Sequence, residues 1–184
     1  MTAVSPITTA LETERLVLRP VTPADADVFL TWRSQPDVVR YMHLPPWTPQ
    51  TAADRLATWS TAPFAQAGDV LVLAVELPGT GVIGEVLLKW AEGTGQVEVG
   101  WALHPDAAGH GYATEAARAL LGLAFDTYGF HRAFARVDAD NVASSAVCER
   151  LGMRLEARLV ENDVRPHDGA WSTSLVYALL ASER

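Results

Sequence analysis

The spacing of apolar residues divides the chain into short strands and helices. Alternation of apolar and polar residues, which is typical of strands with one buried face, predicts strands at 15–21, 70–76, 82–90, 95–103, 133–139, 154–160 and 173–181. Helical spacing and helix-start signals predict helices from 22 to about 35, from 48 to beyond 59, from 111 to about 128, and at 143–151. Residues 36–50, which are rich in proline and aromatic residues, read as a loop.

The order of these elements predicts one domain of α/β class, of the α+β type. We expect a mixed central sheet of about six to seven strands with helices on both faces. A chain of 184 residues is long enough to bury a core, and neither repeats nor low-complexity linkers divide it. We therefore expect a single domain over residues 1–184.

Composition narrows the functional classes. A net charge of −8 argues against a nucleic-acid groove or an anionic membrane as the main partner. No apolar run reaches the roughly 20 residues that cross a bilayer, and the N-terminus is unlike a secretory signal. The single cysteine, Cys148, suits a reducing cytosol, so we expect a cytoplasmic protein. The five histidines form no close pairs, and we expect no metal.

The most informative segment is VEVGWALHPDAAGHGYATEA, at 97–116. An alternating run ends at Pro105, and Gly109 and Gly111 come directly before a strong helix-forming sequence. Glycines allow a ligand to approach the backbone closely, and free N–H groups at a helix N-terminus bind phosphate. A dinucleotide fingerprint would need a small residue where Thr114 stands, and a phosphate-binding P-loop would need Gly-Lys-Ser/Thr, which is absent.

This segment resembles the acyl-CoA loop of the GCN5-related N-acetyltransferases (GNAT), in particular the branch similar to ribosomal-protein alanine acetyltransferases (RimJ/RimL type). A second block, NVASSAVCERLGM at 141–153, and the opening TERLVLRP at 13–20 are also similar to that branch. The resemblance covers nearly the whole chain. It implies transfer of an acetyl group from acetyl-CoA to a primary amine, either a protein N-terminus or a small amine, by direct attack in a ternary complex.

Two alternatives remain open. One is a transferase that uses another acyl-CoA, such as succinyl-CoA. The other is a non-catalytic CoA-binding regulatory domain, which the departures from the family pattern at Ala108 and Thr173 would suit. The family usually has Arg or Gln where Ala108 stands, and often Asp where Thr173 stands. The identity of the acceptor amine therefore cannot be inferred from the alanine acetyltransferases. The oligomeric state is also open, and we consider both a monomer and a homodimer.

The resemblance also implies a set of cofactor-binding residues. The backbone of the strand end pairs with the pantetheine arm, the loop and first helical turn hold the diphosphate, and Asn141 either bonds the pantetheine amides or caps the following helix. The full set is Trp101, Ala102, Leu103, Ala108, Gly109, His110, Gly111, Tyr112, Ala113, Thr114 and Asn141.

Amine attack on a thioester needs a proton acceptor. In the family, a Glu on the strand before the loop often serves as this base, and the corresponding residue here is Glu98. The alternative role for Glu98 is that of a solvent-facing residue, or of one that positions a loop. Glu85 is the second candidate. The branch carries a serine at the position of Ser144, as donor to the sulfur, with helix capping as its alternative role. Cys148 stands where many members have a tyrosine acid, and it reads as a small packed residue.

The acceptor pocket is expected to lie against the early helix and the aromatic loop. By analogy, its walls are Trp32, Tyr41, His43 and Trp47, together with Glu85. For Trp32 a core position is the alternative.

Overall fold

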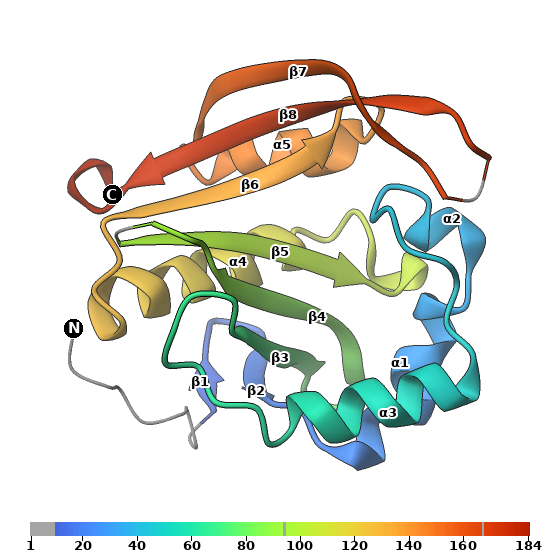
Figure 1. The fold of residues 1–184 in the computed structure, drawn as a ribbon. Coiled ribbons are helices and arrows are strands. Elements are labelled where there is room, and N and C mark those ends of the chain that lie inside the picture. The colour runs from blue at the N-terminus through green and yellow to red at the C-terminus, as the bar shows by residue number, and fades with distance from the viewer. Residues whose placement is uncertain (1–9, 94, 167) are drawn as a thin grey trace.

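The computed structural model describes residues 10–184 except 94 and 167, so expectations for residues 1–9 and His167 lie outside it. Its centre is a mixed eight-stranded sheet with the order β1-β2-β3-β4-β5-β6-β8-β7, which confirms the α/β class (Figure 1). The two-residue β1 extends the expected sheet. The strands are β1 (Leu11–Glu12), β2 (Val17–Pro20), β3 (Val70–Leu77), β4 (Gly81–Trp90), β5 (Gln96–Leu103), β6 (Arg132–Asp138), β7 (Arg154–Val164) and β8 (Trp171–Leu180).

The helices follow the expected order with one addition. They are α1 (Ala26–Arg33), α2 (Pro36–Val39), α3 (Pro49–Trp59), α4 (Tyr112–Gly122) and α5 (Val142–Arg150). The short α2 lies in the segment expected to be a loop, because a proline at its first position suits a helix start. Thr48 caps α3 by accepting a hydrogen bond from the Thr51 N–H at 3.1 Å. Beyond α4 the chain continues as a π-helical turn, Leu123–Thr127.

Alternation along β3 shows that helices cover both faces of the sheet. Leu73 and Val75 belong to the larger hydrophobic cluster, which includes buried residues of α4 and α5. Val72 and Ala74 belong to a smaller cluster with buried residues of α1 and α3. Successive strand residues point to opposite faces, so the sheet lies between two helical layers, as the sequence predicts.

The face that carries the smaller cluster becomes polar beyond β3. On β4, Val86 and Leu88 join the larger cluster, which places Glu85 and Lys89 on the opposite face. On β5 and β6, the same alternation places Glu98 and Arg136 there as well, because Val97, Val99, Ala135 and Val137 face the larger cluster. The sheet therefore presents polar side chains on this face where β4, β5 and β6 adjoin.

The strands β5 and β6 are parallel and separate soon after they meet (Figure 1). Their ladder contains only Gln96↔Arg132, Val97↔Ala133 and Glu98↔Phe134. On its other edge, β5 pairs with β4 as far as Leu103. Residues 99–103 therefore have one strand partner and one free edge in the described part of the chain.

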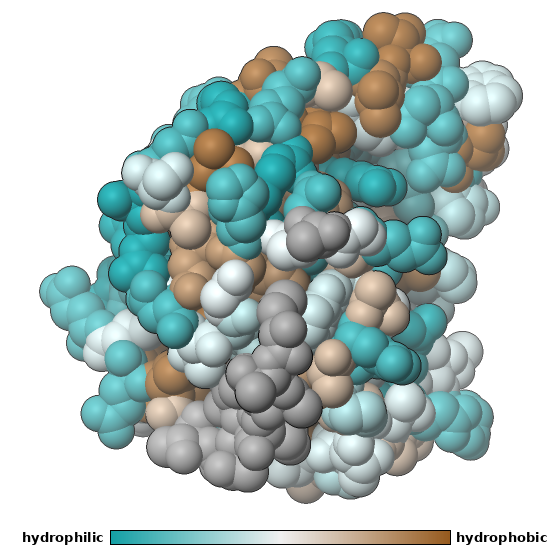
Figure 2. Space-filling model, turned by 60° about the vertical axis from the view of Figure 1, so that its left-hand side comes forward, coloured by the Kyte–Doolittle hydropathy of each residue, from teal (hydrophilic) through white to brown (hydrophobic). Residues whose placement is uncertain are grey.

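The face seen in Figure 2 is mainly hydrophilic, with apolar side chains in separate groups. Exposed apolar side chains of the edge strand β7 are Leu155, Leu159, Val160 and Val164. Among the described residues, no helix combines the length and the apolar character needed to span a bilayer.

Gly84 permits the close approach of β4 to the end of β5. A Cβ there would lie 2.5 Å from the Ala102 carbonyl oxygen and 2.8 Å from the Leu103 Cα. We expect Gly84→Ala to lower the free energy of unfolding by about 1–3 kcal/mol, because backbone must move. Gly122→Ala is the control, since its Cβ would meet only an Asp126 oxygen at 3.9 Å; alanine in this helical position should raise stability by up to ~1 kcal/mol. Denaturant unfolding measures both, and equal effects would contradict the prediction.

Candidate active site

The Gly-rich loop presents a row of free backbone donors. Gly109 and Gly111 both have a φ of 80°, which a side chain rarely permits, and Gly111 is the N-cap of α4. The first helical hydrogen bond there runs from the Glu115 N–H to the Gly111 carbonyl. Within the described chain, the N–H groups of residues 109–114 have no acceptor. Such donors at the positive end of a helix dipole fit a diphosphate.

Ala108 differs from its neighbours because its N–H already bonds to the Pro105 carbonyl at 3.0 Å. It lines the same hollow, but its amide is not free. His110 is exposed, and its ring stacks on Tyr112 with centroids 5.5 Å apart. The Thr114 hydroxyl is buried without a partner among the described residues. The residues present thus fit the diphosphate of coenzyme A mainly through main-chain donors.

Arg15 adds a cation to this loop, a feature that the sequence did not reveal. Its guanidinium donates to the His110 carbonyl at 3.0 Å and lies 4.7 Å from the centre of the Tyr112 ring. It also pairs with Glu115 at 2.7 Å. The two residues are 100 positions apart, so no local pattern could show the contact. The structure thereby supplies a positive charge at a loop where Ala108 has none.

Glu115 fixes this segment to α4. The Thr13 hydroxyl donates to one of its oxygens at 2.6 Å, and the Arg15 N–H donates to the same oxygen at 2.8 Å. Burial opposes the charge on Glu115, but the bonds from Thr13 and Arg15 outweigh it and lower the pKa of the carboxyl. Glu115 is therefore held as a carboxylate that positions Arg15 over the loop.

A hollow of about 1210 Å³ runs from this loop to the free edge of β5. The predicted residues Trp101, Ala102 and Leu103 line it, as do Asn141 and Ser144. Backbone groups at a free strand edge can pair with an extended ligand. The hollow thus brings together all eleven cofactor-binding residues predicted from the sequence, which are 101–103, 108–114 and Asn141.

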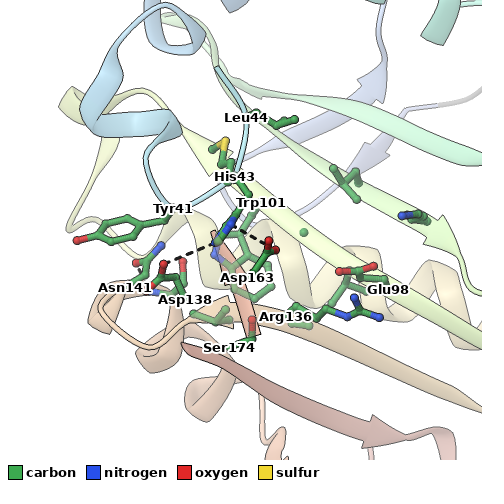
Figure 3. Close-up of a pocket in the computed structure, with 18 of the residues that line it drawn as sticks. Tyr41, His43, Leu44, Glu98, Trp101, Arg136, Asp138, Asn141, Asp163 and Ser174 are labelled. Atoms are coloured by element: carbon green, nitrogen blue, oxygen red, sulfur yellow. Dashed lines mark hydrogen bonds and ion pairs between the residues drawn. The ribbon is translucent and has the colours of Figure 1, made fainter. Parts of the chain in front are cut away.

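A second cavity of about 500 Å³ adjoins the first. Residues that line both are Val38, Tyr41, Met42, Trp101, Asn141 and Ser144. Figure 3 shows Tyr41 and Asn141 at one end of this cavity and Glu98 with Arg136 at the other, with His43, Asp138 and Asp163 between them. The two spaces meet at Trp101 and Ser144, which is where an acyl group and its acceptor would meet.

Asn141 and Ser144 are placed by the start of α5. Asn141 is the N-cap, and its side chain accepts the Ser144 N–H at 3.1 Å. The Ser144 hydroxyl lines both cavities and has no hydrogen-bond partner among the described residues, so it is free to donate. One turn further, Cys148 is fully buried in the larger cluster. Burial raises the pKa of its thiol to about 12, which agrees with the packed role predicted for it.

Glu98 and Glu85 both line the smaller cavity, but their surroundings differ. Glu98 is partly exposed and forms no ion pair with the described residues. Glu85 is buried and forms a very short contact with the guanidinium of buried Arg33. Burial, with the nearby Arg55, lowers the pKa of Arg33 to about 10, so it stays charged at neutral pH. The charge of Glu85 is thus already neutralised by Arg33, whereas Glu98 has no ion-pair partner among the described residues.

The four predicted aromatic and histidine residues separate into two groups. Tyr41 and His43 line the cavity, and His43 lies 3.7 Å from Asp138 and 3.4 Å from Asp163. Trp32 and Trp47 are buried in the smaller hydrophobic cluster and line neither cavity. For Trp32 the core position is the alternative that the sequence left open. Trp47 instead stacks beneath the Arg33 guanidinium, 4.9 Å away.

Within residues 10–184, leaving out 94 and 167, no three His, Cys, Asp or Glu side chains gather as metal ligands would.

The sequence profile of the family described as acetyltransferase (GNAT) domain matches residues 15–154. The chain belongs to this family, and such proteins are acyl-CoA-dependent N-acetyltransferases. The uncharacterized N-acetyltransferase p20 of Bacillus licheniformis is 28% identical over 176 residues, 94% of this chain and 97% of that protein. The uncharacterized N-acetyltransferase YnaD of Bacillus subtilis (strain 168) is 31% identical over 102 residues, 55% of this chain; the match spans only 59% of YnaD.

Solved structures agree with the fold. An acetyltransferase of the GNAT family from Bacillus anthracis matches with a TM-score of 0.82 and 26% identity, over 95% of this chain and all of that one (100%). A spermidine N-acetyltransferase from Vibrio cholerae, solved with CoA and spermine, matches with a TM-score of 0.78 over 92% of this chain and 97% of its own. At 18% identity, the second match shows the fold alone.

We expect Arg15→Gln to weaken CoA binding about fivefold, because a partly exposed cation contributes up to ~1 kcal/mol to an anion contact. Binding of acetyl-pantetheine, which lacks the diphosphate, should stay unchanged. Calorimetric titration measures both ligands, and Arg158→Gln, an exposed arginine on β7 that lines neither cavity, is the control. Equal losses for both ligands, or none, would remove Arg15 from the phosphate site.

Proposed function

We propose that this protein transfers an acetyl group from acetyl-CoA to a primary amine by direct attack in a ternary complex. The observation that supports this most is the row of free N–H groups at 109–114, which opens onto the free edge of β5. The amides and Arg15 would hold the diphosphate, and the backbone of residues 101–103 would hold the pantetheine arm. Asn141 and Ser144 support the further proposal that the protein belongs to the RimJ/RimL-like branch. We also propose that it is cytoplasmic, that it is a monomer or a homodimer, and that it binds neither nucleic acid nor membrane.

In this proposal Glu98 takes a proton from the incoming amine. Glu98 lines the smaller cavity, which would hold the acceptor, and it forms no ion pair with the described residues, so it is available as a base. The distance along β5 from Glu98 to Trp101 is three residues, about 10 Å, so the proton would reach Glu98 through a short chain of hydrogen-bonded water molecules. Ser144 donates a hydrogen bond to the departing sulfur, since its hydroxyl is free and lines both cavities.

Replacing Glu98 with Gln tests the base. We expect kcat/KM to fall about a hundredfold at a pH below the pKa of the acceptor amine, where the amine arrives protonated. The loss should shrink above that pKa, because free amine then forms in solution. A pH–rate profile of one amine with both enzymes measures this, and superimposable profiles would remove Glu98 from the role.

Replacing Ser144 with Ala tests the donor. Turnover should fall at least tenfold, because a hydrogen bond to a charged group contributes about 1.5–3 kcal/mol. Affinity for CoA should change little, because the side chain is proposed to act on the leaving sulfur. Ser145→Ala on the same helix is the matched control, since Ser145 lines neither cavity. Full activity of the Ser144→Ala enzyme would clear Ser144 of any role.

A further inference from the structure

The acceptor cavity is lined by two cations that the protein does not neutralise. Lys89 from β4 and Arg136 from β6 line it, and both side chains belong to exposed residues. Neither forms an ion pair within the described chain. Arg136 has a ring contact only, with its guanidinium carbon 5.8 Å from the centre of Phe134.

Two of the four carboxylates of the cavity, Glu85 and Asp138, are by contrast paired with an arginine. Glu85 contacts Arg33. Asp138 lies 3.5 Å from Arg165 and 3.7 Å from His43, and Asp163 lies 3.4 Å from His43. Glu98 has no ion-pair partner among the described residues, and the only such partner of Asp163 is His43, which is a cation only when it is protonated. Lys89 and Arg136 are therefore the cations of this cavity that form no ion pair, and they share the cavity with the unpaired carboxylate of Glu98.

The strand register places these three charges on one face of the sheet. Lys89 is the ladder partner of Glu98, and Glu98 is the partner of Phe134. Arg136 lies two residues beyond Phe134, on the same face. Neighbouring strands are about 5 Å apart and two residues rise about 7 Å. The long side chains of Lys89 and Arg136 can thus reach one ligand group from either side of Glu98.

We propose that the acceptor amine also carries a carboxylate, and that Lys89 and Arg136 bind this carboxylate. This rests on the amine transfer proposed above. Although the chain has a net charge of −8, Lys89 and Arg136 line this cavity without an ion pair among the described residues. Carboxylates form strong, charge-assisted hydrogen bonds with such cations. A bound anion would also reduce the repulsion between the two cations.

The position of the cations sets the length of the acceptor. Trp101 and Ser144 mark the junction with the CoA hollow, and Trp101 is about 10 Å along β5 from Glu98. An amine that reaches the junction while its carboxylate stays near Glu98 must span several bonds. An ω-amino acid fits this distance better than an α-amino acid.

The test compares three acceptors of similar length: 6-aminohexanoate, hexylamine and 1,6-diaminohexane. We expect kcat/KM to be highest for 6-aminohexanoate. Lys89→Met and Arg136→Met should each lower the ratio of kcat/KM for this acid to kcat/KM for hexylamine about fivefold, because each cation contributes at most ~1 kcal/mol at a partly exposed site. Arg158→Met is the control, an exposed arginine on β7 outside both cavities.

Preference for the diamine, or an equal loss for all three amines, would overturn the proposal. A binding titration tests the proposed carboxylate site independently of catalysis. If no amine is acetylated, the proposed reaction fails, but 6-aminohexanoate should still bind the CoA complex more tightly than hexylamine, and the Lys89→Met/Arg136→Met double variant should abolish the difference. Equal binding of acid and amine would overturn the carboxylate site itself.

Discussion

The separation of β5 from β6 is the constraint on which the candidate site depends. Three ladder pairs hold the strands together, and beyond Glu98 and Phe134 the two strands no longer pair with each other. Backbone groups at 99–103 are left without a strand partner on that edge, while β4 keeps the other edge paired. Unpaired backbone groups are costly when buried, so such an edge is stable only beside solvent or a ligand. Both cavities lie along this opening.

The larger hollow, where we propose that CoA binds, would hold an anion with few charged side chains. Its main donors are amides in the first turn of α4, and Arg15 adds one cation that Glu115 holds in place. The carboxylate of Glu115 lies close enough to offset part of the positive charge of Arg15. Glu115 bonds only part of the guanidinium, which has five N–H donors, and the Arg15 side chain stays 43% exposed. The segment around Arg15 would thereby become part of the proposed phosphate site, although it is 100 residues away from Glu115 in sequence.

The sequence predicted what local patterns encode. The alternation gave the strands β2 to β8 close to their observed bounds, and Asn141 and Thr48 cap the helices whose starts they indicated. Short elements were missed: α2 and the two-residue β1 have too few residues for a period to appear. Trp32 illustrates a different limit, because an aromatic residue near a pocket and one in the core look alike in sequence. Contacts between distant segments, such as Arg33 with Glu85, leave no local signal.

The two halves of the site also differ in how they can change. The half proposed to bind CoA comes largely from the continuous stretch 97–116. Its donors are mainly backbone groups, so a short sequence motif is enough to predict it. The acceptor half is assembled from side chains of β4, β5, β6 and the α2–α3 connection. On these strands the alternate residues, such as Val86, Val97 and Val137, carry the core. Charges at Lys89, Glu98 and Arg136 can therefore be exchanged with little effect on packing, which makes this face the place where acceptor specificity can vary on a constant fold.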